Sequence, residues 1–219
     1  MKTLYEIGQH YQNDKITHHR YDLTYSMFLE PLRNNSFNLL EIGLGDNTAG
    51  TGKSNYLWKE YFPNCILYIM DINHEYNDGL CQVIKGDQSK QEDLEKVKNI
   101  IQQSDIIIDD GSHYPIHQLN TFLYFFENLL NYGGYYIIED IECSYWNPKS
   151  KVYGYETGHF NIIDYFKNIP HQINDEFSNI KNTLNISNIC FGKNCIIIKK
   201  QTEEEIELNK REYRFKHLL

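Results

Sequence analysis

Two aliphatic runs that end in paired acids constrain this chain more than any other feature. The first run, at residues 106–108, is followed directly by Asp-Asp-Gly-Ser-His, whose last residue is His113. The second run is followed directly by Glu139 and Asp140. Short β-branched runs bounded by turn residues are typical of strands buried on both faces. Because open α/β sheets bind ligands beyond the carboxyl ends of their strands, we expect these acids at one mouth of a sheet. Several carboxylates beside one imidazole suit a hard cation such as Mg²⁺, Mn²⁺ or Ca²⁺.

The order of the other segments predicts an α/β fold. Buried or half-buried strands are expected at residues 37–42, 65–70, 82–85, 104–109, 134–138, 186–191 and 195–198. Helical periodicity is present at residues 54–61, 91–103, 117–130 and 160–168. Alternating strands and helices that close with a hairpin predict a mostly parallel sheet with a reversed strand at its edge.

Length and charge narrow the class of protein. The 219 residues suffice for one domain with a full hydrophobic core, and the net charge of −9 argues against nucleic acid as a partner. No apolar run is long enough to span a membrane, and the first residues lack the apolar core of a signal peptide. Five cysteines without a C-x-x-C pair indicate reduced thiols, so we expect a cytoplasmic protein. A small-molecule or sugar substrate is expected, and a homo-oligomer is compatible with the sequence.

The chain divides into three expected parts. Residues 1–36 form an N-terminal segment, with apolar residues at helical spacing from Tyr21 onward. The polar stretch at residues 13–21 is either a surface loop or a flap over the site, and the residues alone leave both open. The core is expected at 37–201, and the charged tail at 202–219 is expected to be helical.

A glycine turn and two polar segments predict a cofactor cradle. Gly43 and Gly45 follow the first strand and precede a helix, an arrangement that binds phosphates or cofactors. Asp71 ends the second strand, where an acid is placed to accept both hydroxyls of a ribose. Asp87 and Gln88 are placed to bond an adenine edge, although a helix N-cap is a competing role for Asp87.

Two familiar nucleotide motifs are incomplete in the same loop. Residues 49–54 resemble the end of a P-loop, but the first glycine of that pattern would fall on Asn47. The third glycine of a dinucleotide fingerprint would fall on Thr48. These differences disfavour an ATPase and an NAD-dependent oxidoreductase.

Taken together, the motifs resemble those of class I S-adenosylmethionine-dependent methyltransferases. The resemblance extends to the metal-dependent sugar O-methyltransferases of macrolide tailoring, the mycinamicin and macrocin type. The matching stretches, in order, are residues 14–21, 39–45, 52–54 with Trp58, 61–63, 71–72, 86–89, 106–113 and 137–146. The resemblance implies a Rossmann-like sandwich with a mostly parallel seven-stranded sheet and an antiparallel C-terminal hairpin strand. It also implies S-adenosylmethionine as cofactor, together with Mg²⁺ or Mn²⁺.

The resemblance also implies roles for individual residues. It places Asp110, Glu139 and Asp140 at the metal and makes His113 the catalytic base. The residues expected at the cofactor are Gly43, Gly45, Ser54, Asp71, Asp87, Gln88, Asp109 and Tyr21. Tyr145 and Trp146 are expected to stack on the face of a sugar, although ordinary packing is an alternative.

Simpler interpretations and other acceptors remain open at this point. Asp110 and Asp140 are also suited to capping turns, and His113 to a structural hydrogen bond. The expected acceptor is a sugar hydroxyl in a nucleotide sugar or glycan precursor. The alternatives are a small non-sugar acceptor, such as a phosphorylated one, and a cofactor-binding domain without turnover. Departures from the family pattern at Thr51 and Glu142 concern the acceptor side, and the longer N-terminal region of some members is not expected.

Overall fold

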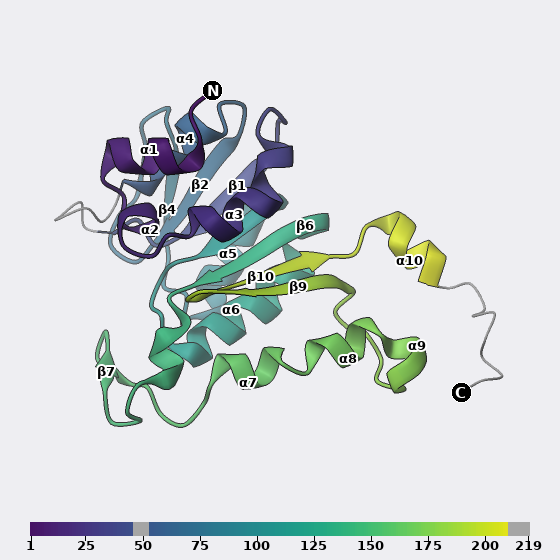
Figure 1. Cartoon of the computed structure of the whole chain (residues 1–219). Coiled ribbons are helices and arrows are strands. Elements are labelled where there is room, and N and C mark those ends of the chain that lie inside the picture. The colour runs from purple at the N-terminus through teal and green to yellow at the C-terminus, as the bar shows by residue number, and fades with distance from the viewer. Residues whose placement is uncertain (46–52, 210–219) are drawn as a thin grey trace.

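An eight-stranded sheet forms the centre of the computed structural model, which describes residues 1–45 and 53–209 (Figure 1). Its strand order is β3-β4-β2-β1-β5-β6-β10-β9. The bounds in chain order are β1 Asn38–Ile42, β2 Ile66–Asp71, β3 Tyr76–Asn77, β4 Gln82–Lys85, β5 Ser104–Asp109, β6 Leu130–Glu139, β9 Ile186–Gly192 and β10 Cys195–Lys200.

Strand pairing confirms the predicted α/β fold and corrects the strand number. The pairs β4–β2, β2–β1, β1–β5 and β5–β6 are parallel, whereas β10 is antiparallel to both β6 and β9. The prediction of seven strands was wrong by one, because β3 also joins the sheet at its edge beside β4. This strand has two exposed residues, so it carries no hydrophobic alternation that a sequence pattern could reveal.

Helices cover both faces of the sheet. One face carries α1 (Leu4–Tyr11), α2 (Asp14–Thr17), α3 (Asp22–Leu29), the short helix η1 (Glu30–Leu32) and α4 (Ser54–Tyr61). The other face carries α5 (Gln91–Ile101), α6 (Pro115–Asn128), α7 (Ile162–Phe166) and α8 (Ile169–Ile173). In Figure 1 the purple N-terminal helices and the teal α6 lie on opposite sides of the strands. We call these the α1–α4 face and the α5–α8 face.

The pleat of the strands assigns each side chain to one of these faces. Leu39, Ile106 and Ile137 pack on the α1–α4 face, whereas their neighbours Leu40, Ile107 and Ile138 pack on the α5–α8 face. Successive side chains of a strand point to opposite sides, so this alternation continues to the polar residues at the strand ends.

The remaining elements lie after β6. They are η2 (Ile141–Tyr145), the small hairpin β7 (Lys151–Val152) and β8 (Tyr155–Glu156), α9 (Asp175–Ser178) and α10 (Glu203–Asn209). Within the expected helical tail at 202–219 the structure has α10, and residues 210–219 lie outside the described residues, as do residues 46–52 of the P-loop-like stretch. Among the helices that the structure describes, none has the length and apolar character needed to cross a membrane. The division at residues 36 and 201 stays a prediction.

Lys200 supports the end of α6 from within β10. Its buried ammonium donates to the carbonyl oxygen of Phe126 in the last turn of α6 at 2.6 Å, and to that of Leu130, the first residue of β6, at 2.9 Å. Carbonyls in the last turn of a helix lack helical partners. Burial lowers the pKa of Lys200. We predict that Lys200→Met lowers the free energy of unfolding by about 2 kcal/mol, because buried acceptors lose their donor. Urea unfolding measures this, with the half-buried Lys199→Met as control, and equal midpoints for the two variants would contradict the assignment.

Candidate active site

The alternation along the strands brings three acids together on the α1–α4 face. Glu41 lies two residues beyond Leu39, and Glu139 lies two residues beyond Ile137, so both carboxylates share the face of those side chains. Asp110 follows the end of β5, and its backbone N–H donates to the Ile42 carbonyl at 3.0 Å. The carboxyl ends of β1, β5 and β6 therefore place Glu41, Asp110 and Glu139 in one cluster.

Lys15 of α2 joins this cluster as its cation. Its ammonium lies 2.6 Å from Glu139 Oε2 and 3.2 Å from Glu41 Oε1, and it also donates to Asp110 Oδ2. The side chain of Lys15 is 3% exposed. The N-terminal segment thus reaches the carboxyl ends of the strands, and its role as a flap stays a prediction.

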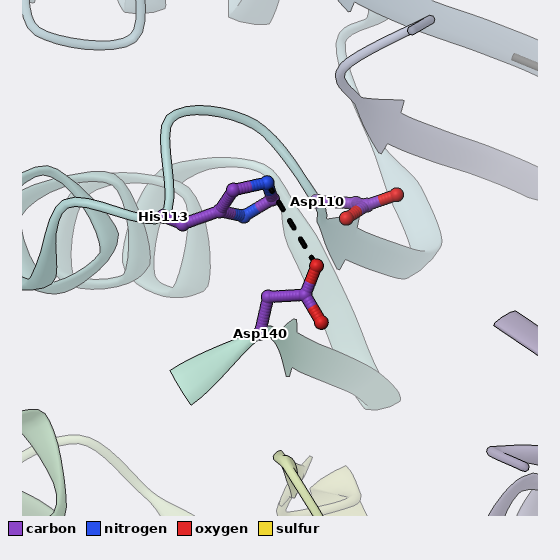
Figure 2. Close-up of side chains that lie close together, drawn as sticks. All are labelled: Asp110, His113 and Asp140. Carbon is purple, nitrogen blue, oxygen red and sulfur yellow. Dashed lines mark ion pairs between the residues drawn. The ribbon is translucent and has the colours of Figure 1, made fainter. Parts of the chain in front are cut away.

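Asp110, His113 and Asp140 converge at the edge of this cluster (Figure 2). One ligand atom from each lies within 4.8 Å of the other two, a spacing that suits a shared cation. His113 Nε2 is 3.8 Å from Asp140 Oδ2, and both side chains are 17% exposed. His113 and Asp140 have left-handed backbones, with φ of +53° and +51°, which histidine and aspartate adopt more readily than most residues. Such conformations cost energy and concentrate at functional sites.

Asp140 is oriented by two partners on its other side. Its Oδ1 accepts hydrogen bonds from the Tyr21 hydroxyl at 2.6 Å and from Asn194 Nδ2 at 2.9 Å. Burial and the nearby acids Glu139 and Asp140 raise the pKa of Tyr21, so its phenol stays protonated and donates. The structure therefore places the Tyr21 hydroxyl against Asp140. The expected role of Tyr21 at the cofactor stays a prediction.

Glu139 is held differently from the other two predicted metal ligands. It is fully buried, with Oε2 bound to Lys15 and Oε1 accepting the Tyr25 hydroxyl at 2.5 Å. Burial raises the pKa of Glu139, and the Lys15 ammonium opposes that effect. Within the described ranges, the group spaced for a cation contains His113 in place of Glu139. A role for Glu139 as a ligand stays a prediction.

A cavity of about 510 Å³ opens in front of these residues. Its volume is in the range of small-molecule sites. Its lining includes six of the residues expected at the cofactor, namely Gly43, Gly45, Ser54, Asp71, Asp87 and Gln88, and also Asp110, His113 and Asp140. The predicted cofactor side and the acidic cluster therefore share one cavity.

The glycine turn and Asp71 also line the cavity. Gly43 has a φ of +96°, and a Cβ there would collide with the backbone of Asp110, so this close approach of two strand ends requires glycine. Asp71 accepts backbone hydrogen bonds from Leu44 at 3.1 Å and Asn73 at 2.8 Å, and His74 Nδ1 lies 2.8 Å away. Burial would raise the pKa of Asp71, but these hydrogen bonds outweigh it and lower the pKa.

Asp109 does not reach the cavity. It lies two residues after Ile107 in β5, so its side chain points to the same α5–α8 face. There it accepts hydrogen bonds from Gln88 Nε2 at 3.1 Å and from the Tyr136 hydroxyl at 3.3 Å. Burial raises the pKa of Asp109 to about 6. The expected placement at the cofactor is therefore not seen, and Asp109 instead orients Gln88, whose Oε1 accepts the Ser112 N–H at 2.6 Å.

Asp87 is bonded within its own turn and is not the N-cap of the following helix. Its Oδ1 accepts from the backbone N–H of Ser89 at 2.9 Å and from the Ser89 hydroxyl at 2.7 Å, whereas Lys90 occupies the N-cap position of α5. The residue nevertheless lines the cavity. Contact with an adenine edge stays a prediction.

The aromatic residues at the cavity differ from those expected. Tyr145 and Trp146 are exposed, and Tyr145 lines a separate pocket of about 470 Å³ together with His19 and Lys193. The cavity itself is lined by Tyr153 and Tyr155 of the β7–β8 hairpin. Tyr155 stacks on Tyr114 with ring centroids 5.3 Å apart. The roles of Tyr145 and Trp146 stay predictions, and the tyrosine-rich sequence at 153–155 was the available signal for the second pair.

The sheet order and the cavity together define a class I methyltransferase fold. Solved structures agree: MycE, a methyltransferase of the mycinamycin biosynthetic pathway in complex with Mg and SAH, matches with a TM-score of 0.78 and 25% identity over 92% of this chain. MycE in complex with Mg, SAH and mycinamycin VI matches with a TM-score of 0.77 and 26% identity over 93%. The chain covers 54% and 55% of those two chains.

Curated relatives are sugar O-methyltransferases. The 8-demethyl-8-alpha-L-rhamnosyl tetracenomycin-C 2'-O-methyltransferase of Streptomyces olivaceus is 34% identical over 149 residues, which is 66% of this chain and 39% of the relative. The L-olivosyl-oleandolide 3-O-methyltransferase of Streptomyces antibioticus is 35% identical over 56% of this chain and 32% of its own length. The mycinamicin VI 2''-O-methyltransferase of Micromonospora griseorubida is 35% identical over 56% and 31%.

These matches confirm the resemblance to macrolide sugar O-methyltransferases. The chain spans 31–39% of the length of these curated relatives. No protein-family model matches the chain.

Proposed function

We propose that this protein is an S-adenosylmethionine- and divalent-metal-dependent O-methyltransferase that acts on a sugar hydroxyl. The observation that carries the proposal is one cavity whose lining includes both the glycine turn with Asp71 and the group formed by Asp110, His113 and Asp140. A donor site and an acceptor-activating site thus face the same space. The relatives named above, which are sugar O-methyltransferases, support this combination.

The cofactor side rests on the first two strand ends. Asp71 is placed to accept the ribose hydroxyls, and Gly43 and Gly45 line the cavity beside it. Ser54 lies at the start of α4 in the same wall, with its hydroxyl donated to Glu41 at 2.6 Å. When bound, S-adenosylmethionine supplies an electrophilic methyl group on a sulfonium.

The metal side rests on the acidic cluster. The oxygens of Asp110 and Asp140 are hard donors that suit Mg²⁺ or Mn²⁺, and one oxygen of each lies within 4.8 Å of the other, a spacing that fits a shared ion. A divalent cation supplies Lewis acidity, which makes a neighbouring hydroxyl more acidic. Glu139, one residue before Asp140, is proposed as a further ligand on the resemblance alone.

His113 is proposed as the general base. It lines the cavity beside Asp140, with its Nε2 3.8 Å from Asp140 Oδ2. A sugar hydroxyl is a very weak acid, and a base positioned to accept its proton typically accelerates such a step by roughly 10²–10⁴-fold. Its Nδ1 is buried and, within the described part of the chain, has no hydrogen-bond partner.

The proposed acceptor is a sugar hydroxyl in a glycoside or a nucleotide sugar. The cavity lining includes Tyr153 and Tyr155, whose rings provide flat faces for a sugar ring. A cytoplasmic location is part of the proposal and agrees with five cysteines, all in the described ranges, that form no disulfide.

A transfer assay with methyl-labelled S-adenosylmethionine tests the proposal. The full chain would be incubated with rhamnosyl glycosides, nucleotide sugars and small phosphorylated alcohols, with Mg²⁺ and with excess chelator. We expect label in at least one sugar acceptor, and loss of transfer in chelator. Transfer only to a phosphorylated alcohol would replace the acceptor, and full activity in chelator would remove the metal from the proposal.

A further inference from the structure

Lys15 carries a buried charge to which the proposed function gives no role. Its side chain is 3% exposed, and its ammonium contacts the carboxylates of Glu41, Asp110 and Glu139. These contacts place an ammonium group at the carboxyl ends of β1, β5 and β6. Burying a charge costs free energy unless opposite charges and hydrogen bonds compensate for the lost solvation.

The backbone fixes Lys15 on both sides. The Asn13 side chain accepts from the Lys15 N–H at 3.2 Å, and the Lys15 carbonyl accepts from the Tyr21 N–H at 2.8 Å. Tyr21 in turn donates its hydroxyl to Asp140. The ammonium is thus presented to the acids from a segment that is itself bonded to the site.

The carboxylate of Asp110 depends on this ammonium. Among the residues that the structure describes, Lys15 is its one side-chain hydrogen-bond partner, and the Asp110 side chain is 24% exposed. A carboxylate at a loop with one partner has little else to fix its rotamer. Glu139 differs, because Tyr25 holds its second oxygen.

We propose that Lys15 is a positioning residue of the cation site, whose ammonium orients the Asp110 carboxylate toward His113 and Asp140. The inference rests on the proposed function, because Asp110 must be a cation ligand for its orientation to matter. Partners that orient ligating groups typically contribute about 10–100-fold to metal affinity.

The sign of the effect separates positioning from simple electrostatics. A positive charge beside a cation site repels the cation, so its removal would tighten binding if charge were all that mattered. Positioning predicts the opposite, because Asp110 would lose its orientation. The two accounts therefore differ in direction and not only in size.

A variant with unchanged net charge separates the loss of Asp110 orientation from the loss of stability. Lys15→Met leaves Glu41 and Glu139 buried without their cation and is expected to be less stable than the unmodified protein. The double variant Lys15→Met with Glu41→Gln loses one positive and one negative charge, so its net charge is unchanged. The glutamine oxygen can still accept the Ser54 hydroxyl. Lys200→Met is the matched control, since it removes another buried lysine that contacts α6 and not the acids.

The measurement is calorimetric titration of the full chain with Mn²⁺ in the presence of S-adenosylhomocysteine. We expect Mn²⁺ affinity to fall by about 10–100-fold in Lys15→Met and in the double variant, and to stay unchanged in Lys200→Met. The double variant should regain stability on urea unfolding without regaining Mn²⁺ affinity, which a merely structural role would not produce.

Two negative outcomes are distinguishable. If the unmodified protein binds both ligands and the double variant binds Mn²⁺ as tightly or more tightly, the inference about Lys15 is overturned and the proposed function stands. If the unmodified protein binds neither S-adenosylhomocysteine nor Mn²⁺, the proposed function fails and the inference fails with it.

Discussion

Asp110→Asn is expected to lower the rate of methyl transfer by about a thousandfold or more, with S-adenosylhomocysteine binding retained. A metal ion acting as a Lewis acid contributes several kcal/mol to transition-state stabilisation, and each 1.36 kcal/mol is about tenfold in rate. The fold should persist, because Lys15 keeps Glu139 and Glu41 as partners. Initial rates at saturating Mg²⁺ and acceptor, with calorimetry for the cofactor analogue, measure both effects.

The matched control for this variant is Asp164→Asn. Asp164 lies on α7, is exposed and pairs with Lys167 on the surface. The Asp164→Asn variant should leave the rate of methyl transfer and the binding of S-adenosylhomocysteine unchanged. A similar rate for Asp110→Asn and the unmodified protein would show that Asp110 is not a ligand of a catalytic cation, and would leave turn capping as its role.

His113→Asn is expected to lower kcat by roughly 10²–10⁴-fold, the usual contribution of a general base. Asparagine is chosen because it tolerates the left-handed backbone that His113 adopts at a φ of +53°. Unlike Asp110→Asn, this variant should bind Mn²⁺ nearly as tightly as the unmodified protein. Measuring kcat and Mn²⁺ affinity on the same variant therefore distinguishes a general base from a metal ligand.

A loss of Mn²⁺ affinity in His113→Asn would change the role assigned to His113. Its imidazole belongs to the group spaced for a cation, so a loss of Mn²⁺ affinity in His113→Asn would make it a ligand and remove it as the base. His171→Asn, an exposed histidine on α8, serves as control and should change neither property.

The fold was predictable because its signals are local. Aliphatic runs such as the one ending at Asp109, glycine turns and helical periodicity each predict an element without knowledge of its neighbours. The structure confirms the parallel core and the closing hairpin of β9 and β10. The edge strand β3 was missed because two exposed residues pair only through contact with β4.

The candidate site was predictable in part, and strand parity explains the main difference. Asp109 and Asp110 are equivalent as letters in the sequence, but alternation from Ile107 sends Asp109 to the α5–α8 face. In the same way, alternation along β1 from Leu39 places Glu41 on the α1–α4 face, beside Lys15, Asp110 and Glu139. That signal was present in the sequence and was not used.

Lys15 could not be predicted from local pattern. It lies 95 residues before Asp110 and 124 before Glu139, and only the packing of α2 over the strand ends brings the three together. A lysine in a polar stretch ordinarily indicates a solvated surface. The tertiary structure here makes it the buried partner of three acids.

Calorimetric titration of the full chain with S-adenosylhomocysteine, with and without Mn²⁺, tests the central claim most directly. The claim is that one cavity holds an adenosyl cofactor against Asp71 and a divalent cation against Asp110 and Asp140. We expect saturable binding of both ligands to the same molecule, with cation binding lost in Asp110→Asn and analogue binding retained. Absence of S-adenosylhomocysteine binding to the unmodified protein, with or without Mn²⁺, would contradict the claim.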